Sequence, residues 1–191
     1  MNEIRSQSDV PFKTLKIAED EEEHSIELQL PFLKQIFKER DDVTIIPIYV
    51  GSVVQNEERI YGRFLAKYFD DPSSLFVISS DFCHWGNRFR FTPREFPIPT
   101  EMPMNTKIEA LDKQALQLIA LQDSEGFAKY LQVTGNTICG RNCILIFLQI
   151  LRHAQTKVTV DFTHYSQSTN LPDVVSREDS CVSYAAGVAT I

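Results

Sequence analysis

Short runs of β-branched residues alternate with amphipathic stretches along this chain, and this alternation constrains the fold more than any other feature. Residues 43–50 (VTIIPIYV) and 75–81 (LFVISSD) have the composition of buried parallel strands. Between them, residues 55–69 place Ile60 and Phe64 at helical spacing. This strand–helix–strand order predicts an α/β fold, in which helices flank a mainly parallel or mixed sheet.

The rest of the chain continues the pattern, and its length suits a single domain over residues 1–191. Residues 22–38 predict a helix, in which Pro31 causes a kink or a division into two shorter helices. The closing runs, 158–166 and 180–190, predict strands that pair antiparallel. The remaining predicted elements are helices at 105–121, 123–132 and 141–153 and a Pro-rich loop at 92–104.

Charge and cysteine content narrow the class of protein. The formal net charge of −7 argues against a nucleic-acid partner, because phosphate binding needs clustered Lys and Arg. No run approaches the roughly 18 apolar residues of a membrane helix, and the first residues lack the apolar core of a signal peptide. The four cysteines suit free thiols or metal ligands in a reducing compartment. We therefore expect a cytoplasmic protein, with the nucleus as an alternative location.

The motif SSDFCHWG (79–86) is the first candidate site. It directly follows an apolar run, so Asp81 and His84 are expected at the carboxyl edge of a sheet, where α/β proteins bind ligands. The Asp81 carboxylate could fix the tautomer of His84 and let that residue act as an acid or base. A buried structural pair is the alternative. Trp85 is a candidate for substrate or partner binding, with core packing as its alternative.

The motif NTICGR (136–141) is the second candidate site. Cys139 stands at a turn just before a predicted helix, and a helix amino terminus favours the thiolate, the form that binds metals and attacks electrophiles. The alternative is an ordinary core cysteine. Cys143 lies four residues on, but a single CxxxC pattern is weak evidence for zinc. Any metal site must therefore be assembled from segments distant in the sequence.

Two further candidate sites, one histidine and one pair of arginines, lie outside the two motifs. His24 stands between Glu23 and Glu27 and is a candidate catalytic residue, with an exposed ion pair as its alternative. Arg88 and its neighbour Arg90 follow the first motif and could bind an anionic partner through the bidentate guanidinium fork. Ordinary surface arginines are the alternative.

Five separated segments together resemble the Memo family, named for mediating ErbB-driven cell motility. The segments appear in the family's order and extend over nearly the whole chain. They are EEEHSIELQLPF (21–32), VTIIPIYVG (43–51), LFVISSDFCHWGNRFRF (75–91), NTICGR (136–141) and SCVSYAAGVA (180–189). The resemblance implies that the chain corresponds to the carboxyl-terminal two-thirds of such a protein.

The resemblance implies a fold similar to that of the class III extradiol dioxygenases, which are non-heme iron enzymes. It implies a pocket in which two histidines and one cysteine bind iron or copper. Cys139 matches the cysteine ligand, Asp81 and His84 match residues beside the pocket, and His24 matches the histidine of the family's EHSIE motif. Family members are implicated in cell migration, microtubule behaviour downstream of receptor tyrosine kinases, and iron or copper redox handling.

The chain departs from the family pattern at the metal site. The two histidine ligands of the family lie in segments similar to APHAGY and GPSHH, and neither segment occurs here. After NTICGR, Asn142 and Cys143 replace the usual His-Pro. The resemblance therefore implies one ligand of three and no tight metal binding by this chain. Three functions stay open: a Memo-like signalling protein with a partial redox site, a dioxygenase-like oxidoreductase, and a non-enzymatic adaptor or inactive product that binds a phosphotyrosine receptor peptide.

Overall fold

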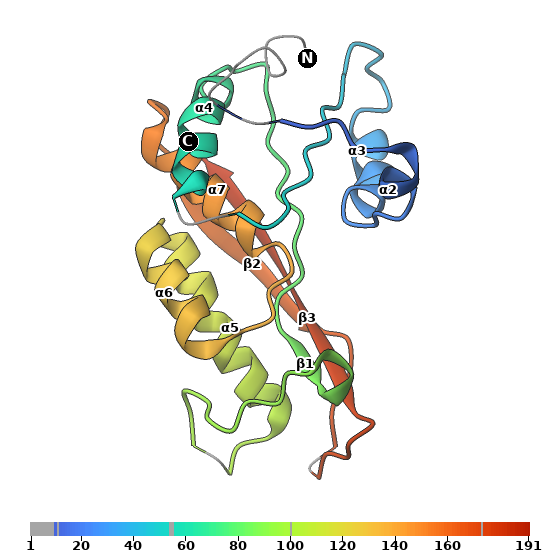
Figure 1. Ribbon diagram of the computed structural model, residues 1–191, viewed down its shortest axis with the longest axis vertical. Coiled ribbons are helices and arrows are strands. Elements are labelled where there is room, and N and C mark those ends of the chain that lie inside the picture. The colour runs from blue at the N-terminus through green and yellow to red at the C-terminus, as the bar shows by residue number, and fades with distance from the viewer. Residues whose placement is uncertain (1–9, 11, 54–55, 100, 173) are drawn as a thin grey trace. The chain divides into compact units, whose positions relative to one another are not determined.

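The computed structural model describes residues 10, 12–53, 56–99, 101–172 and 174–191. The chain divides into two compact units, residues 1–52 and 53–191, and each is described by itself. That the two units form the single predicted domain stays a prediction. Figure 1 shows the order of the helices and strands along the chain.

The described residues of the first unit form three short helices, α2 (Ile17–Glu21), η1 (Glu27–Gln29) and α3 (Leu30–Ile36). Pro31 stands in the first turn of α3, where the missing amide hydrogen of proline costs nothing. The helix predicted at 22–38 is thus divided into two shorter helices, which is one of the two effects predicted for Pro31. None of these helices buries a residue.

The second unit carries the larger helices and the sheet. Its helices are α4 (Glu57–Phe69), η2 (Asn87–Phe89), α5 (Met104–Ala120), α6 (Ser124–Thr134) and α7 (Arg141–His153). Its strands are β1 (His84–Gly86), β2 (Thr159–Gln167) and β3 (Ser180–Thr190). The four longer helices lie within two residues of their predicted positions, which confirms the helical periodicity. None of the described helices has both the length and the apolar character to cross a membrane.

The sheet has the order β1-β3-β2, and both of its pairings are antiparallel. Trp85 lies opposite Cys181 between β1 and β3, and Gln167 lies opposite Ser183 between β2 and β3. The α/β class is therefore confirmed, and so is the antiparallel pairing of the two closing strands. The described sheet is small and antiparallel, however, whereas a mainly parallel or mixed sheet was predicted.

The difference arises from residues 43–50 and 75–81, which were predicted to be strands and form none. Strands need a neighbour that accepts and donates main-chain hydrogen bonds. No described residue pairs with either segment in a ladder. Their apolar side chains stay largely exposed, as shown by Ile45 (47%) and Leu75 (69%).

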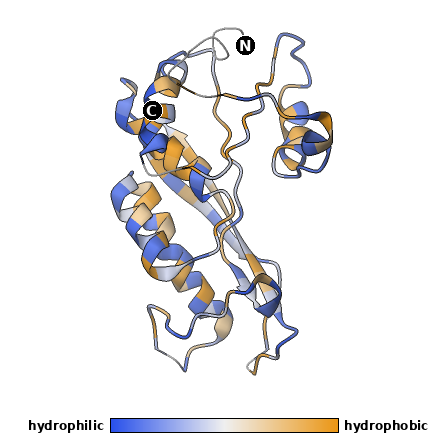
Figure 2. Ribbon diagram, in the orientation of Figure 1, coloured by the Kyte–Doolittle hydropathy of each residue, from blue (hydrophilic) through white to orange (hydrophobic). Residues whose placement is uncertain are grey.

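The hydrophobic core of the second unit lies between the helices and the sheet. Its fully buried members include Ile108 on α5, Phe127 on α6 and Leu148 on α7, each 0% exposed. Hydrophobic and hydrophilic residues alternate around α5 and α6, as expected for helices with one buried face (Figure 2). This core fixes α5 and α7 beside the segments that carry the candidate site.

Candidate functional site

Two segments far apart in the sequence, residues 80–84 and 137–140, lie against each other in the second unit. The His84 N–H donates to Thr137 Oγ1 at 2.8 Å, and the Thr137 hydroxyl donates to the His84 carbonyl at 3.0 Å. At the other end of the segments, the Gly140 N–H donates to Ser80 Oγ at 3.0 Å. These bonds join the two predicted motifs directly.

Cys139 lies at the exposed edge of this arrangement. Its Sγ accepts a hydrogen bond from the Asp81 main-chain N–H at 3.1 Å. The residue stands two positions before α7 begins at Arg141. A cysteine sulfur is a ligand type that soft metal ions prefer, and this one is accessible from solvent.

The ring of His84 is held in one tautomer by main-chain oxygens. Its Nδ1 lies 3.1 Å from the Phe82 carbonyl oxygen and 3.0 Å from the Thr137 carbonyl oxygen. Carbonyl oxygens only accept, so Nδ1 carries a proton and donates to them. In the neutral ring, Nε2 then has the lone pair. The two carbonyl oxygens thus fix the tautomer, a role predicted for the Asp81 carboxylate.

Asp81 lies on the other side of the same ring. Its Oδ2 is 3.6 Å from His84 Nε2, and the side chains of His84 and Asp81 are 20% and 42% exposed. A carboxylate oxygen and a nitrogen lone pair at this distance both attract a proton or a cation. The pair can therefore hold a proton at Nε2 and exchange it with solvent.

One aromatic ring packs against this pair, and the structure separates the two predicted partner-binding residues. Phe89 packs edge-on against His84, with 5.0 Å between the ring centroids. The exposed Arg88 guanidinium lies 5.5 Å from the centroid of the Phe89 ring. Trp85 is only 4% exposed and belongs to the core, in agreement with its packing alternative. Of the two predicted partner-binding residues, only Arg88 is accessible.

His24 belongs to the first unit, whereas Cys139 and His84 belong to the second. Its Nδ1 is 3.2 Å from Glu27 Oε2, and its side chain is 75% exposed. This geometry is that of an exposed ion pair, the alternative considered for this residue. A catalytic role for His24 stays a prediction.

Sequence reasoning missed Tyr184 and Asp112. Tyr184 on β3 borders the exposed edge: burial raises the pKa of its phenol, and the negative charges of Asp81, Cys181 and Cys139 raise it further. Asp112 on α5 is 0% exposed, and burial raises the pKa of its carboxyl above the ordinary value. A signal for Asp112 did exist. It occupies the apolar face of α5, where a charged residue is unusual.

The donors near Cys139 fit a metal ion only in part. A thiolate, an imidazole lone pair and a carboxylate suit iron or copper by ligand type. In the described part of the chain, however, no group of three or more His, Cys, Asp or Glu side chains is arranged to hold a metal ion. Cys139, His84 and Asp81 are neighbours without forming a complete ligand set.

These observations define an α/β protein that presents an exposed thiol beside a histidine–carboxylate pair. A family model described as Memo-like protein matches residues 1–188, and the chain belongs to that family. It is 42% identical over 181 residues to Protein memo-1 homolog of Caenorhabditis elegans, covering 93% of this chain and 50% of that protein. It is 39% identical over 184 residues to Protein MEMO1 of Homo sapiens, covering 94% of this chain and 60% of that protein.

Protein MEMO1 of Danio rerio is similarly related, with 38% identity over 184 residues that cover 94% of this chain and 60% of that protein. The chain therefore spans about half to three-fifths of the length of the curated relatives it matches. What the relatives do as whole proteins enters below as a proposal.

Proposed function

We propose that this chain is a Memo-like protein that acts in receptor tyrosine kinase signalling to cell motility and microtubules, and that it carries part of an iron or copper redox site. The observation that supports the site is the hydrogen bond from the Asp81 N–H to Cys139 Sγ at 3.1 Å. This bond keeps an exposed sulfur beside the segment that carries His84. Membership of the Memo-like family supports the signalling role and a cytoplasmic location.

Each residue of the site has a distinct proposed part. Cys139 supplies the sulfur ligand, and a bound iron or copper ion would supply one-electron redox chemistry. His84 holds or releases a proton at Nε2, and Asp81 stabilises the protonated ring across 3.6 Å. The described residues do not supply the three or more ligands of a complete metal site, so we expect this chain to bind a metal ion only weakly. The alternative enzymatic function is that of a dioxygenase-like oxidoreductase, which would require the complete ligand set of the family.

Metal titration tests this proposal. Cu(I) and Fe(II) are titrated into the protein, into Cys139→Ser and into the matched control Cys143→Ser, which lies four residues away on α7. We expect weak binding that is lost in Cys139→Ser and kept in Cys143→Ser. Tighter binding is expected for a full-length relative such as human Protein MEMO1. Equal binding by both variants, or equally tight binding by this chain and the relative, would contradict the proposal.

A second candidate function is docking of a phosphotyrosine receptor peptide. It is favoured by one observation: the Arg88 guanidinium is exposed and lies over Phe89, whose ring contacts His84. A guanidinium beside an aromatic ring can bind both the phosphate and the ring of a phosphotyrosine. A phosphotyrosine peptide should therefore bind the protein more tightly than its unphosphorylated form, and Arg88→Gln should remove the difference. Unchanged discrimination in Arg88→Gln would reject this candidate.

A further inference from the structure

Asp112 is a buried carboxylate that has no part in the proposed metal or peptide binding. It stands in the middle of α5 and is 0% exposed, among core residues such as Ile108 and Ala115 on the same face of the helix. In the part of the chain that the structure describes, no Lys, Arg or His forms an ion pair with it. A charge in the core is costly unless hydrogen bonds compensate for it.

Hydrogen-bond donors from four places in the chain surround this carboxylate. The Asn136 side-chain amide donates to Oδ1 at 2.8 Å, and the Tyr165 hydroxyl donates to Oδ2 at 2.9 Å. The Ser183 hydroxyl also donates to Oδ2, and the Cys83 main-chain N–H is a further donor. We call Asp112, Asn136, Tyr165 and Ser183 the buried network.

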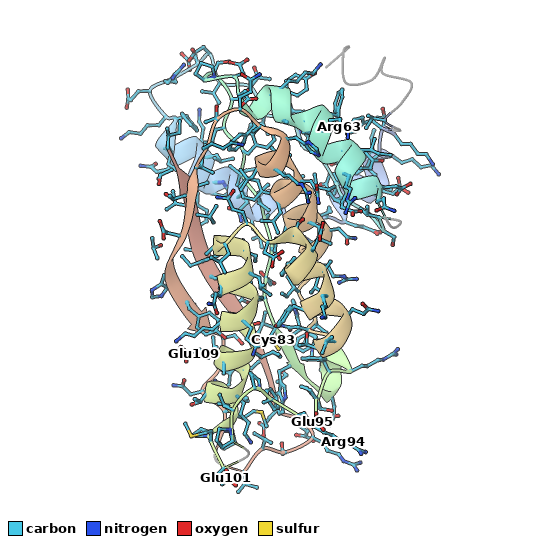
Figure 3. All side chains as sticks on the ribbon, turned by 90° about the vertical axis from the view of Figure 1, so that its left-hand side faces the viewer. Arg63, Cys83, Arg94, Glu95, Glu101 and Glu109 are labelled. Atoms are coloured by element: carbon cyan, nitrogen blue, oxygen red, sulfur yellow. The ribbon has the colours of Figure 1, made fainter. Side chains whose placement is uncertain are left out.

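Two of these donors belong to the segments that form the candidate site. Cys83 lies between Asp81 and His84, in the interior of the second unit (Figure 3). Asn136 directly precedes Thr137, which holds the main chain and the ring of His84. One carboxylate thus binds both segments, each within three residues of a reactive side chain.

The other two donors secure the same carboxylate to the sheet. Tyr165 stands on β2 and Ser183 on β3. Ser183 also bonds the first segment directly, since its main-chain N–H donates to the Cys83 carbonyl at 3.0 Å. The Phe82 N–H in turn donates to the Ser183 carbonyl at 2.8 Å. Hydrogen bonds through Asp112 therefore connect the segments around Cys83 and Asn136 to α5, β2 and β3.

We propose that Asp112 is a positioning residue, which sets the placement of Asp81 and His84 relative to Cys139 by binding the main chain of Cys83 and the side chain of Asn136. The physical reason is the irregular backbone of both segments. Outside the short strand β1 neither segment lies in a regular helix or strand, so individual hydrogen bonds, those to Asp112 among them, place its reactive residues. This inference deepens the proposed function but concerns geometry that exists without a metal.

The test compares two donors to the same carboxylate. Asn136→Ala removes a donor that belongs to the site, and Tyr165→Phe removes a donor that stands on β2 away from both segments. Three measurements are made on the metal-free protein: the melting temperature, the rate of alkylation of Cys139 by iodoacetamide, and the NMR titration of the His84 ring.

We expect both variants to melt at lower temperature than the wild type, since each leaves Asp112 with one donor fewer. Only Asn136→Ala should also change the alkylation rate of Cys139 severalfold and shift the NMR signals of the His84 ring. Ser183→Ala serves as a second variant if Asn136→Ala does not fold. It removes a bond to Asp112 and one to the Cys83 carbonyl, and should move the same measurements.

Equal changes in Asn136→Ala and Tyr165→Phe would overturn the proposal, because the carboxylate would then act through general stability alone. Unchanged site measurements in both Asn136→Ala and Ser183→Ala would overturn it as well. Failure of the wild type to bind Cu(I) or Fe(II) would contradict the proposed function and leave these measurements valid. The two failures are therefore distinguishable.

Discussion

The candidate site is held by two regions of opposite character. In the buried network Asp112, Asn136 and Ser183 are buried and Tyr165 is partly buried, and its hydrogen bonds join α5, β2, β3 and both site segments. The exposed edge, which we define as Asp81 and Cys139, has two main-chain contacts to sulfur, from the Asp81 N–H at 3.1 Å and to the Asp81 carbonyl at 3.8 Å, and one ion pair at 3.6 Å. Stability and reactivity are therefore separated in this site. The buried network positions the site segments, and the exposed edge is accessible to solvent and ligands.

The largest effect is expected inside the buried network. Asp112→Ala leaves its donors without an acceptor in the core, so it should lower the free energy of unfolding by about 4 kcal/mol. Denaturant unfolding measures this loss. Asp123→Ala is the matched control, because Asp123 caps α6 at the surface by accepting from the Gly126 N–H at 2.8 Å. The control should lose only about 1 kcal/mol. If both variants lost the same free energy of unfolding, the buried network would contribute no more to stability than a surface cap.

An intermediate effect is expected where the two segments meet. Thr137→Val keeps the shape of the side chain but removes both hydroxyl bonds to the main chain of His84. The free energy of unfolding should fall by about 1–2 kcal/mol, because a partly buried N–H loses its acceptor. Thr163→Val on β2 is an exposed control and should change it by less than about 0.5 kcal/mol. A Thr137→Val variant as stable as the wild type would show that these bonds do not hold the segments together.

A smaller effect, with a pH signature, is expected at the surface carboxylate of Asp70. Its oxygens accept from the Gln155 and Thr156 N–H groups at 3.0 and 2.8 Å, and these bonds lower its pKa below the ordinary value of 3.8. A carboxyl with a lowered pKa stabilises the fold above its ordinary pKa, and this contribution is lost as the pH falls through the folded pKa.

Asp70→Asn should therefore be less stable than the wild type near neutral pH, and the two proteins should converge at acid pH. Denaturant unfolding between pH 2 and pH 7 measures the difference. Asp112 is the opposite case, because burial raises its pKa and its ionisation weakens the fold as the pH rises through the folded value. A stability difference for Asp70→Asn that grows toward acid pH would contradict the assigned bonds.

The smallest effect on stability is expected at the exposed edge. Asp81→Asn keeps the main-chain N–H that bonds Cys139 and removes only the carboxylate near His84. The free energy of unfolding should change by less than about 0.5 kcal/mol, as for most exposed substitutions. The NMR signals of the His84 ring should nevertheless change at neutral pH. A large loss of stability would place Asp81 with the buried network instead.

The sequence predicted what depends on neighbours along the chain. The helical spacing of α5, α6 and α7 appears in the sequence itself, so these helices were found within two residues. The strands predicted at 43–50 and 75–81 failed because a strand depends on a partner that composition does not specify. The antiparallel pair of β2 and β3 succeeded because the two runs are near in sequence and both have strand composition.

The same division holds for the site. Asp81, His84 and Cys139 were selected because their motifs follow an apolar run or precede a helix, and the structure brings them together. The carbonyl oxygens that fix the His84 tautomer were unpredictable, since they depend on how 80–84 packs against 137–140. Asp112 was missed because a single acid within a helical pattern does not reveal which distant donors surround it.

The candidate site exists only if residues 80–84 pack against residues 137–140, with the Cys139 sulfur bonded to the Asp81 amide. Amide NMR of the wild type and Cys139→Ala tests it most directly, because removal of the sulfur takes the acceptor from one identifiable N–H. We expect a large shift of the Asp81 amide signal, with smaller shifts at Ser80 and His84. Shifts confined to the sequence neighbours of Cys139, with Asp81 unchanged, would contradict it.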